Sequence, residues 1–333
     1  MPTVAVLGAG GWGTAMAVVL ANKPGMTVRL WAAQEQSGRE LIATRENTRL
    51  LPGVRIPESV RITTSPAEAT EGADCWLVVI PTAYLRKSVE RLIPFVRPHV
   101  PLVSLTKGLE IGTFLRPTEI LQQVLGTNRL AALSGPSHAE EVVRGLPTSV
   151  VVASPDPVLA GWVQEHVGGE RLRVYTNTDL IGVEIAGALK NVLGIAAGIC
   201  DGLKFGDNAK AALLTRGLVE MQRFGVTHGA NPETFYGLAG LGDLMTTCFS
   251  PHGRNRRLGE RLARGELLTE ATSGPQISEG VFTAKSVYER VTRAGLYAPI
   301  MTGVYRVLYE GRSPHDAVHE LLDRPQKCET RVA

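Results

Sequence analysis

The order of apolar and polar residues divides the chain into two parts of different texture. Up to about residue 176, short apolar or β-branched runs alternate with stretches of helical periodicity, as is typical of a parallel, doubly wound sheet. Proline and glycine separate many of these runs. The pattern predicts strands at residues 4–7, 27–31, 60–63, 76–80, 102–105, 130–133, 149–153 and 172–175.

After residue 178 the β-branched runs become rare, and long helical periodicities replace them. Helices are predicted at residues 180–202, 208–225, 254–263, 279–293, 301–309 and 314–322. We place a domain boundary at this change of texture. The second domain is therefore predicted to be all-helical.

A glycine-punctuated turn follows the first predicted strand and precedes an Ala-rich helix. Gly8, Gly10 and Gly13 stand at the G-x-G-x-x-G spacing. In this context the missing Cβ atoms serve a tight turn, close approach of backbone to a pyrophosphate, and helix-on-strand packing. The N-terminus of the helix adds unpaired N–H groups and a positive dipole end. We expect α/β architecture: a Rossmann-type doubly wound parallel sheet that binds a dinucleotide (residues 1–178), followed by an all-helical domain (residues 179–333).

Composition narrows the classes of partner. The chain has 333 residues, of which 44% are hydrophobic and 20% charged, as in a globular protein of about two domains. Its net charge of +3, from 35 basic and 32 acidic residues, creates no global field that would favour nucleic acid or an anionic membrane. The four cysteines are scattered without a C-x-x-C pair, so we expect reduced thiols and no metal site.

Targeting signals are not recognisable either. No charged segment followed by an apolar signal-like run begins the sequence, and no uncharged apolar run is long enough to span a bilayer. We therefore expect a cytoplasmic protein without membrane insertion.

A lysine lies in the middle of an apolar stretch. Residues 182–198 are apolar nearly all round, so a helix made from them should be buried with Lys190 inside it. Gly194 and Gly198 each cost about 1 kcal/mol in a helix, which indicates close approach of another backbone or of a ligand. Gly194 and Ala197 share the face of Lys190 and are expected to leave space beside its amine.

Burial would give Lys190 a chemical use. Desolvation lowers the pKa of a lysine, so its ammonium can exchange a proton near neutral pH. The structural alternative is a lysine that reaches the surface or pairs with Glu184 or Asp201.

Three further groups are candidates for the same cleft. Lys107 follows a predicted strand, at the carboxyl edge where open α/β sheets bind ligands, although a surface lysine in a turn is the simpler interpretation. Ser137 follows the next strand and is predicted early in a new helix, as an anion contact or merely a cap. Ala139 stands where a hydrolase elbow needs glycine, which disfavours a hydrolase. Arg254 opens a helix and could clamp a phosphate with the N–H groups there.

These pieces occur in an order that resembles the bacterial-type NAD(P)-dependent glycerol-3-phosphate dehydrogenase family. The resemblance runs from residue 3 to about residue 322. It rests on Gly8-Ala-Gly-Gly-Trp-Gly-Thr-Ala15, Thr106-Lys-Gly-Leu-Glu110, Ser134-Gly-Pro-Ser-His-Ala-Glu140, Gly187-Ala-Leu-Lys-Asn-Val192 with Gly198-Ile-Cys-Asp-Gly-Leu-Lys-Phe-Gly206, and Gly240-Leu-Gly-Asp-Leu244 leading to Gly253-Arg-Asn255.

The resemblance implies that Lys190 is the catalytic residue, which protonates the carbonyl of dihydroxyacetone phosphate during hydride transfer, and that Asp243 orients or charges it. It implies substrate contacts by Lys107, Gly135, Ser137, Lys190, Asp243, Gly253, Arg254 and Asn255, with the substrate phosphate on Arg254 and Asn255. It implies cofactor contacts by Gly8, Gly10, Gly11, Trp12, Gly13, Lys107, Ala139, Arg254, Ile277 and Glu279. On the residues alone, Ile277 and Glu279 could equally mark the start of a helix.

Two departures from the family pattern matter. Gly253 stands where the family usually has serine, so a hydroxyl contact to phosphate is lost and a backbone N–H would replace it. After the second strand, Ala32 and Ala33 provide neither the acid that binds a ribose 2′-hydroxyl nor a basic residue for a 2′-phosphate, although Gln34 and Arg39 are near in sequence. The sequence therefore leaves NADPH against NADH open, with the family habit leaning to NADPH or dual use.

The hypothesis is an enzyme that reduces dihydroxyacetone phosphate to sn-glycerol 3-phosphate, the backbone of phospholipids, with NADPH or NADH. One alternative is a hydroxyacid dehydrogenase of the same architecture, with a substrate carboxylate at Arg254. Another is a catalytically silent nucleotide sensor that uses the same glycine turn. The long apolar helices of the second half also make a homodimer plausible.

Overall fold

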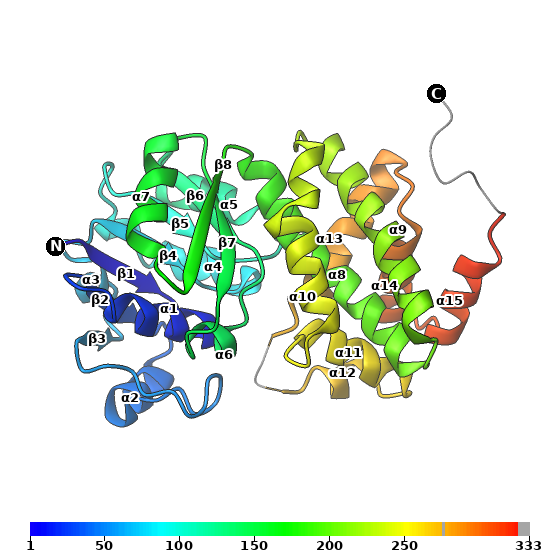
Figure 1. The fold of residues 1–333 in the computed structure, drawn as a ribbon, viewed down its shortest axis with the longest axis horizontal. Coiled ribbons are helices and arrows are strands. Elements are labelled where there is room, and N and C mark those ends of the chain that lie inside the picture. The colour runs from blue at the N-terminus through cyan, green and yellow to red at the C-terminus, as the bar shows by residue number, and fades with distance from the viewer. Residues whose placement is uncertain (275–276, 326–333) are drawn as a thin grey trace.

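The first part of the chain forms one sheet in the computed structural model, which describes residues 1–274 and 277–325. Within those residues the sheet has eight strands in the order β3-β2-β1-β4-β5-β6-β7-β8 (Figure 1). Every predicted strand is present, with ends shifted by at most two residues. The strands are β1 (Thr3–Leu7), β2 (Thr27–Trp31), β3 (Val60–Thr63), β4 (Cys75–Val78), β5 (Leu102–Ser104), β6 (Leu130–Ser134), β7 (Thr148–Ala153) and β8 (Leu172–Asn177).

The prediction of a fully parallel sheet is wrong at one pairing. β1 to β6 pair in parallel, but β7 lies antiparallel to β6, with Leu133 opposite Val152, and β8 follows the direction of β7. The segment between β6 and β7 contains only one short helix, α6 (Ala139–Val142), so the chain re-enters the sheet from the edge at which it left. This keeps the segment after β6 at the carboxyl edge, where the candidate site lies.

Helices cover both faces of the sheet, which confirms the doubly wound arrangement. One apolar core joins a sheet face to α1 and α7, through side chains such as Met16 and Val163. The other joins the opposite face to α3, α4 and α5, through Leu85 and Ile120 among others. The helices of this part are α1 (Gly11–Ala21), α2 (Glu35–Thr44), α3 (Pro66–Thr70), α4 (Thr82–Glu90), η1 (Ile93–Phe95), α5 (Pro117–Leu125), α6 and α7 (Pro157–Val167).

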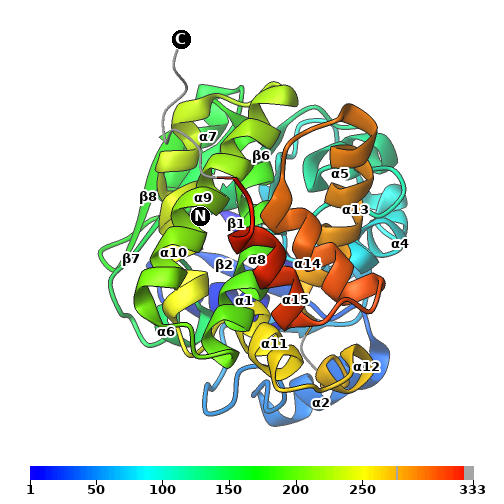
Figure 2. The same cartoon turned by 90° about the vertical axis from the view of Figure 1, so that its right-hand side faces the viewer.

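The second part is helical, as predicted, and is built around one central helix. α8 is packed by α9, α10, α11, α13 and α14 (Figure 2). The sequence pattern did not predict η2, η3, α10 or α12, which are short. The helices are α8 (Leu180–Gly202), α9 (Gly206–Thr227), η2 (Pro232–Tyr236), the π-helix η3 (Leu238–Gly242), α10 (Asp243–Phe249), α11 (Arg254–Ala263), α12 (Leu268–Ala271), α13 (Glu279–Ala294), α14 (Pro299–Tyr309) and α15 (Pro314–Leu322).

α8 is the buried helix that its sequence predicts. Its length and composition would allow it to cross a membrane, but 89% of its most apolar window is buried inside the protein. Its glycines allow neighbouring segments to approach closely. A Cβ on Gly198 would lie 1.9 Å from the carbonyl oxygen of Arg256, and one on Gly194 would lie 2.9 Å from the Thr247 side chain. The space expected beside Lys190 is therefore filled by α10 and α11. The proposed boundary after residue 178 falls between β8 and α8 and stays a prediction.

A buried carboxylate joins the two parts. Glu184 of α8 accepts hydrogen bonds from Arg116 Nη1 at 2.7 Å, from the backbone N–H of Thr118 at 2.8 Å and from Thr118 Oγ1 at 2.5 Å. Both partners lie at the start of α5, against the sheet. Because Glu184 is fully engaged here, it does not pair with Lys190.

Replacing this carboxylate should weaken the junction. In Glu184→Gln an amide NH₂ would face the donors of Arg116 and Thr118, so we expect the free energy of unfolding to fall by about 1–3 kcal/mol. Urea unfolding of the variant measures the change, with Glu40→Gln, a substitution at an exposed position of α2, as the matched control. Equal unfolding midpoints for the two variants would contradict the assigned role.

Candidate active site

The glycine turn meets its three geometric expectations. Gly8 has φ of +123°, in the region that favours glycine. A Cβ on Gly13 would lie 1.8 Å from the carbonyl oxygen of Gly8, so helix and turn could not pack as they do. In front of Gly10 there is no heavy atom within 4 Å of an ideal Cβ position, which leaves room for a phosphate.

α1 starts at Gly11 with Gly10 as its N-cap, so the N–H groups of its first turn have no partner within the helix. Gly10, Gly11, Trp12 and Gly13 line a cleft of about 240 Å³ between the sheet and the helical part. Open space, free N–H groups and a helix dipole together fit the pyrophosphate of a dinucleotide.

Lys190 lies at the floor of this cleft. The residue is 8% exposed, and its Nζ lies 3.0 Å from Asp243 Oδ1 and 2.6 Å from Thr247 Oγ1. Asp243 and Thr247 stand four residues apart on α10, so both face α8. The alternative partners are excluded, because Asp201 pairs with Lys210 and Arg256.

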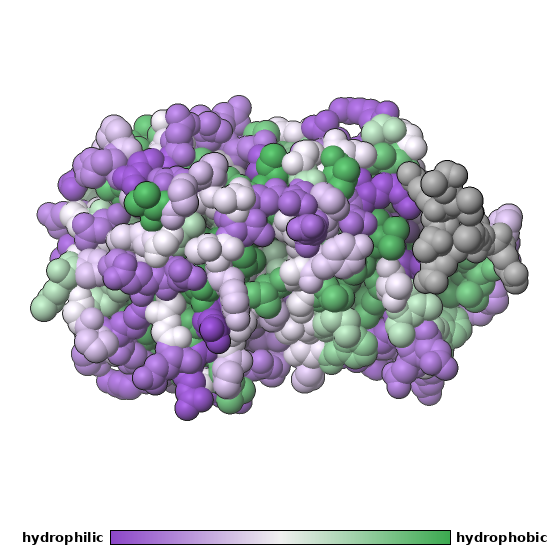
Figure 3. All heavy atoms as spheres, turned by 45° about the horizontal axis from the view of Figure 1, so that its top comes forward, coloured by the Kyte–Doolittle hydropathy of each residue, from purple (hydrophilic) through white to green (hydrophobic). Residues whose placement is uncertain are grey.

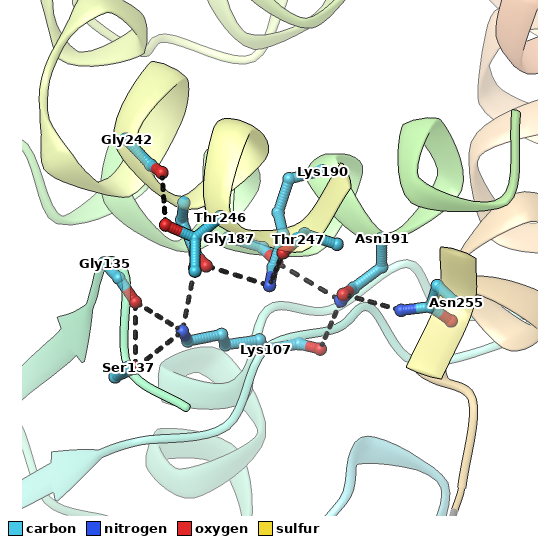
Figure 4. A network of polar contacts seen from close by, with 11 residues as sticks. Lys107, Gly135, Ser137, Gly187, Lys190, Asn191, Gly242, Thr246, Thr247 and Asn255 are labelled. Atoms are coloured by element: carbon cyan, nitrogen blue, oxygen red, sulfur yellow. Dashed lines mark hydrogen bonds and ion pairs between the residues drawn. The ribbon is translucent and has the colours of Figure 1, made fainter. Parts of the chain in front are cut away.

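Asp243 also holds the second lysine. Lys107 Nζ donates to Asp243 Oδ2 at 2.8 Å, to the carbonyl oxygen of Gly135 at 2.8 Å and to Ser137 Oγ at 3.2 Å. The dashed lines in Figure 4 connect Lys107 to Gly135 and Ser137 on one side. On the other side they lead through the shared carboxylate to Lys190. One carboxylate therefore joins two ammonium groups that come from opposite sides of the cleft.

This arrangement sets the protonation of the three groups. The pKa of Lys190 is lowered to about 8, mainly by burial; Asp243 opposes this shift and Lys107 contributes to it. Burial alone would raise the pKa of Asp243, but the two lysines hold it below its usual value. Near neutral pH, Lys190 can therefore both give and take a proton.

The segment after β6 approaches the cleft from the sheet side. Gly135 has φ of +120°, and the Oγ of Ser137 donates to its carbonyl oxygen at 2.8 Å. The prediction that Ser137 lies within a helix is wrong, since α6 starts at Ala139 and His138 is its N-cap. Ser137 and Ala139 both line the cleft.

A chain of amides links α8, α11 and α13, and Figure 4 shows its part between Lys107, Asn191 and Asn255. Asn191 donates to the carbonyl oxygen of Lys107 at 3.2 Å and accepts from Asn255 Nδ2 at 2.9 Å. Asn255 Oδ1 in turn accepts from the backbone N–H of Gly280 at 3.1 Å. Asn255 lines the cleft but is buried, with its side-chain oxygen and one amide hydrogen engaged in this network. Its backbone N–H, in the first turn of α11, has no partner within the helix.

Arg254 starts α11 and is exposed at the cleft, where its Nη1 donates to the carbonyl oxygen of Ile277 at 3.1 Å. Gly253 is the N-cap of this helix. A Cβ on Gly253 would lie 2.3 Å from the carbonyl oxygen of Thr247, so a serine there would require the turn before α11 to shift. Glycine thus lets this turn pack closely against α10.

Ile277 and Glu279 also line the cleft, beside Arg254, and both belong to the residues that the structure describes after the gap at 275–276. Gln276, directly before Ile277, lies outside the described residues. Glu279 accepts from the backbone N–H of Thr82 at 2.9 Å and so joins α13 to α4. Burial raises the pKa of Glu279 to about 7.

Thr247, Asn191 and His138 are among the cleft residues that the sequence does not predict as site residues. Thr247 stands four residues after Asp243, but the sequence pattern predicts no helix there, so it does not indicate that the two share a face. Asn191 directly follows Lys190, and only its place in the motif of residues 187–192 marks it in the sequence. His138 lines the cleft, and burial together with Lys190 lowers its pKa.

A second cavity, of about 310 Å³, lies among α8, α9, α14 and α15 and is lined mainly by apolar side chains such as Ile199 and Val304. It shares no lining residue with the cleft. The glycine turn, Lys107, Lys190 and Arg254 converge in the cleft, which is therefore the candidate active site.

Comparisons with known proteins agree with this architecture. Residues 3–160 match the model of the NAD-dependent glycerol-3-phosphate dehydrogenase N-terminus, and residues 179–319 match that of the C-terminus of the same family. Glycerol-3-phosphate dehydrogenase [NAD(P)+] 1 of Salinibacter ruber is 46% identical over 99% of this chain and 97% of its own. The enzyme of Chlorobium limicola is 47% identical over 98% of this chain and 99% of its own.

A solved structure is similar over the whole fold. The crystal structure of glycerol-3-phosphate dehydrogenase from Coxiella burnetii superposes with a TM-score of 0.93 at 41% identity, covering 97% of this chain and 99% of that one. The resemblance therefore extends across both the sheet and the helices that surround the cleft.

Proposed function

The chain belongs to the NAD-dependent glycerol-3-phosphate dehydrogenase family, and we propose that Lys190 is the proton donor in the reaction of that family. That reaction is the reduction of dihydroxyacetone phosphate to sn-glycerol 3-phosphate with NADH or NADPH. The observation that carries the proposal is the buried Lys190 ammonium, held by Asp243 at 3.0 Å at the floor of the cleft. Family membership favours this reaction over a hydroxyacid dehydrogenase and over a silent nucleotide sensor.

The dinucleotide, when bound, supplies or accepts the hydride. The glycine turn and the start of α1 hold its pyrophosphate, and Trp12, Ala139, Ile277 and Glu279 border the remainder of its site. Open space before Gly10 supports this assignment.

Lys190 gives its proton to the carbonyl oxygen of the substrate as negative charge develops there. Asp243 keeps the amine protonated near neutral pH and fixes its position together with Thr247. Lys107, which is anchored by Gly135 and Ser137, positions the substrate and adds positive charge beside the carbonyl. In the reverse direction, neutral Lys190 accepts the proton from the hydroxyl group.

Arg254 binds the substrate phosphate, together with the N–H groups of Gly253 and Asn255 at the start of α11. A guanidinium and helix-end N–H groups form a suitable phosphate site. The exposure of Arg254 at the cleft supports this role.

The decisive assay follows the oxidation of NADH and of NADPH by the purified chain with dihydroxyacetone phosphate. Formation of sn-glycerol 3-phosphate is the expected result. Turnover of 2-keto acids without turnover of dihydroxyacetone phosphate would instead identify a hydroxyacid dehydrogenase. Binding of dinucleotide with no turnover of either substrate class would identify a sensor.

We further propose that two copies of the chain form a dimer through α10. Leu241 of η3 and Met245 and Phe249 of α10 are 38%, 43% and 49% exposed, and their spacing of four residues places them on one face. On the face drawn in Figure 3, hydrophilic residues cover most of the sheet part, whereas apolar residues gather over the helical part.

Sedimentation velocity is expected to give the mass of a dimer, and Met245→Glu is expected to give a monomer, because a buried carboxylate at the contact would be uncompensated. Ile42→Glu on α2, an equally exposed apolar position, is the matched control and should stay dimeric. A monomeric unaltered protein would refute the proposal.

A cytoplasmic location is proposed as well. Among the described residues, Cys75, Cys200 and Cys248 are buried and unpaired, which fits a reducing compartment. Cys328 lies outside the described residues. Cell fractionation followed by immunoblotting tests the location, and recovery in a secreted fraction would contradict it.

A further inference from the structure

The end of β2 lacks a residue of its own that could select the dinucleotide. In folds of this kind, an acid about 20 residues after the first glycine binds the ribose 2′-hydroxyl, or a nearby arginine accommodates a 2′-phosphate. Here the segment after Trp31 is Ala32-Ala33-Gln34. Neither alanine has a charged group that could bind a ribose hydroxyl or a phosphate. The residue that selects the dinucleotide must therefore come from elsewhere.

An arginine from another element reaches this position. Arg91 is the C-cap of α4, sixty residues beyond Trp31, and its Nη1 donates to the carbonyl oxygen of Ala33 at 2.7 Å. Its Cζ lies 5.0 Å from the centroid of the Trp31 ring. Trp31 is fully buried and donates through Nε1 to the carbonyl oxygen of Thr64 at 3.1 Å, so the ring is a fixed support.

The guanidinium of Arg91 is thus held in a fixed orientation while most of its N–H donors stay available. One of its five N–H groups is used by Ala33, and within the described residues no carboxylate forms an ion pair with it. The residue is exposed at the end of β2. Stacking on an aromatic ring leaves the remaining N–H groups able to bind a phosphate by a two-point contact.

Arg39, the other basic residue near the end of β2, is paired with a carboxylate. Arg39 of α2 donates through Nε to Glu35 Oε1 at 3.2 Å, and Nη2 lies at the same distance from that oxygen. Its charge is therefore already balanced by a carboxylate one turn away. Gln34 carries no charge. Of these candidates, Arg91 has an available positive charge and direct contact with the segment after β2.

We propose that Arg91 binds the 2′-phosphate of NADPH and makes the chain prefer NADPH to NADH. This proposal rests on the proposed function and names the residue that decides its cofactor. With no acid at Ala32 or Ala33, the 2′-hydroxyl of NADH has no charged acceptor there, whereas the 2′-phosphate of NADPH meets a preoriented guanidinium.

Two measurements on Arg91→Ala test the proposal. The ratio of kcat/KM for NADPH to kcat/KM for NADH should fall about 10- to 100-fold, mainly through KM for NADPH, since one charge-assisted contact is lost. Calorimetric titration with adenosine 2′,5′-bisphosphate, which contains no nicotinamide, should show a similar rise in Kd relative to AMP. Arg91→Lys, which keeps the charge but loses the planar fork, should be intermediate.

Arg39→Ala is the matched control and should leave the cofactor ratio close to that of the unaltered protein. A fall in kcat/KM by the same factor for both dinucleotides, together with a lower melting temperature, would show that Arg91 merely supports Trp31. Preference of the unaltered protein for NADH, or a larger ratio change in Arg39→Ala, would also overturn the proposal. Absence of turnover with either dinucleotide would instead count against the proposed function, while the bisphosphate titration would still report on Arg91.

Discussion

Lys190→Met is expected to lower kcat for the reduction of dihydroxyacetone phosphate about 1,000-fold, because the substrate oxygen loses its proton donor. Methionine retains the length of the buried stem and removes the ammonium, so α8 should keep its packing. Steady-state kinetics with NADPH and NADH measure the loss. The Kd for each dinucleotide should change little, since the glycine turn that holds it lies on the other side of the cleft.

Lys87→Ala, on the exposed face of α4, is the control and should retain full activity. Melting temperatures of both variants confirm that the fold is intact. If Lys190→Met retained more than about a tenth of the kcat of the unaltered protein, another group would have to be the proton donor.

The pH dependence of the unaltered protein gives an independent check on this role. Burial lowers the pKa of Lys190 to about 8. Reduction requires the protonated amine, so its rate should fall as pH rises through about 8, whereas the oxidation of sn-glycerol 3-phosphate requires the neutral amine and should become faster over the same range. The expected result is a falling pH–rate profile for reduction and a rising one for oxidation, both changing near the same pH.

Asp243→Asn should have the second largest effect, about a 100-fold fall in kcat for reduction at neutral pH. Asp243 raises the proton affinity of Lys190, so its removal lowers the pKa of that lysine below about 8 and leaves less of it protonated. The descending limb of the pH profile for reduction should therefore move to lower pH. This shift distinguishes a lower proton affinity of Lys190 from a mere misplacement of its amine. Misplacement would lower kcat without moving the descending limb of the pH profile.

The same substitution should also destabilise the protein, by about 3 kcal/mol at pH 7, because two ammonium groups would share the cleft without their carboxylate. The loss should be smaller at pH 9, where Lys190 is neutral and less charge is left uncompensated. Urea unfolding at the two pH values measures this difference, with Asp323→Asn at an exposed position as the control. An equal loss at both pH values would contradict the assigned charge balance.

Several features could be predicted from the sequence because they depend on neighbouring residues. Short apolar or β-branched runs predict the strands, and all eight are present. The spacing of Gly8, Gly10 and Gly13 predicts the turn, because the need for positive φ and close packing is local. The apolar circumference of residues 182–198 predicts a buried helix, and α8 spans Leu180–Gly202.

Other features depend on segments that are distant in sequence. The antiparallel β7 depends on how the chain folds back after β6, and local periodicity cannot encode direction. The sequence pattern does not predict α10, because this short helix follows a π-helical turn and shows no extended helical periodicity. The phosphate role of Asn255, inferred from resemblance, stays a prediction, and its side chain is mainly part of an amide network in this structure.

The sequence by itself determined the eight strands, the central helix, the glycine turn and, through the ordered motifs, the family. Tertiary structure decided which charges meet. Asp243 bridges Lys107 and Lys190, and Arg91 reaches Ala33 from a different helix. These contacts join residues that are tens of positions apart, so they exist only once packing has placed the helices against the sheet. The physical reason is range: steric preference and periodicity act over a few residues, whereas charge pairing in the cleft requires the whole fold.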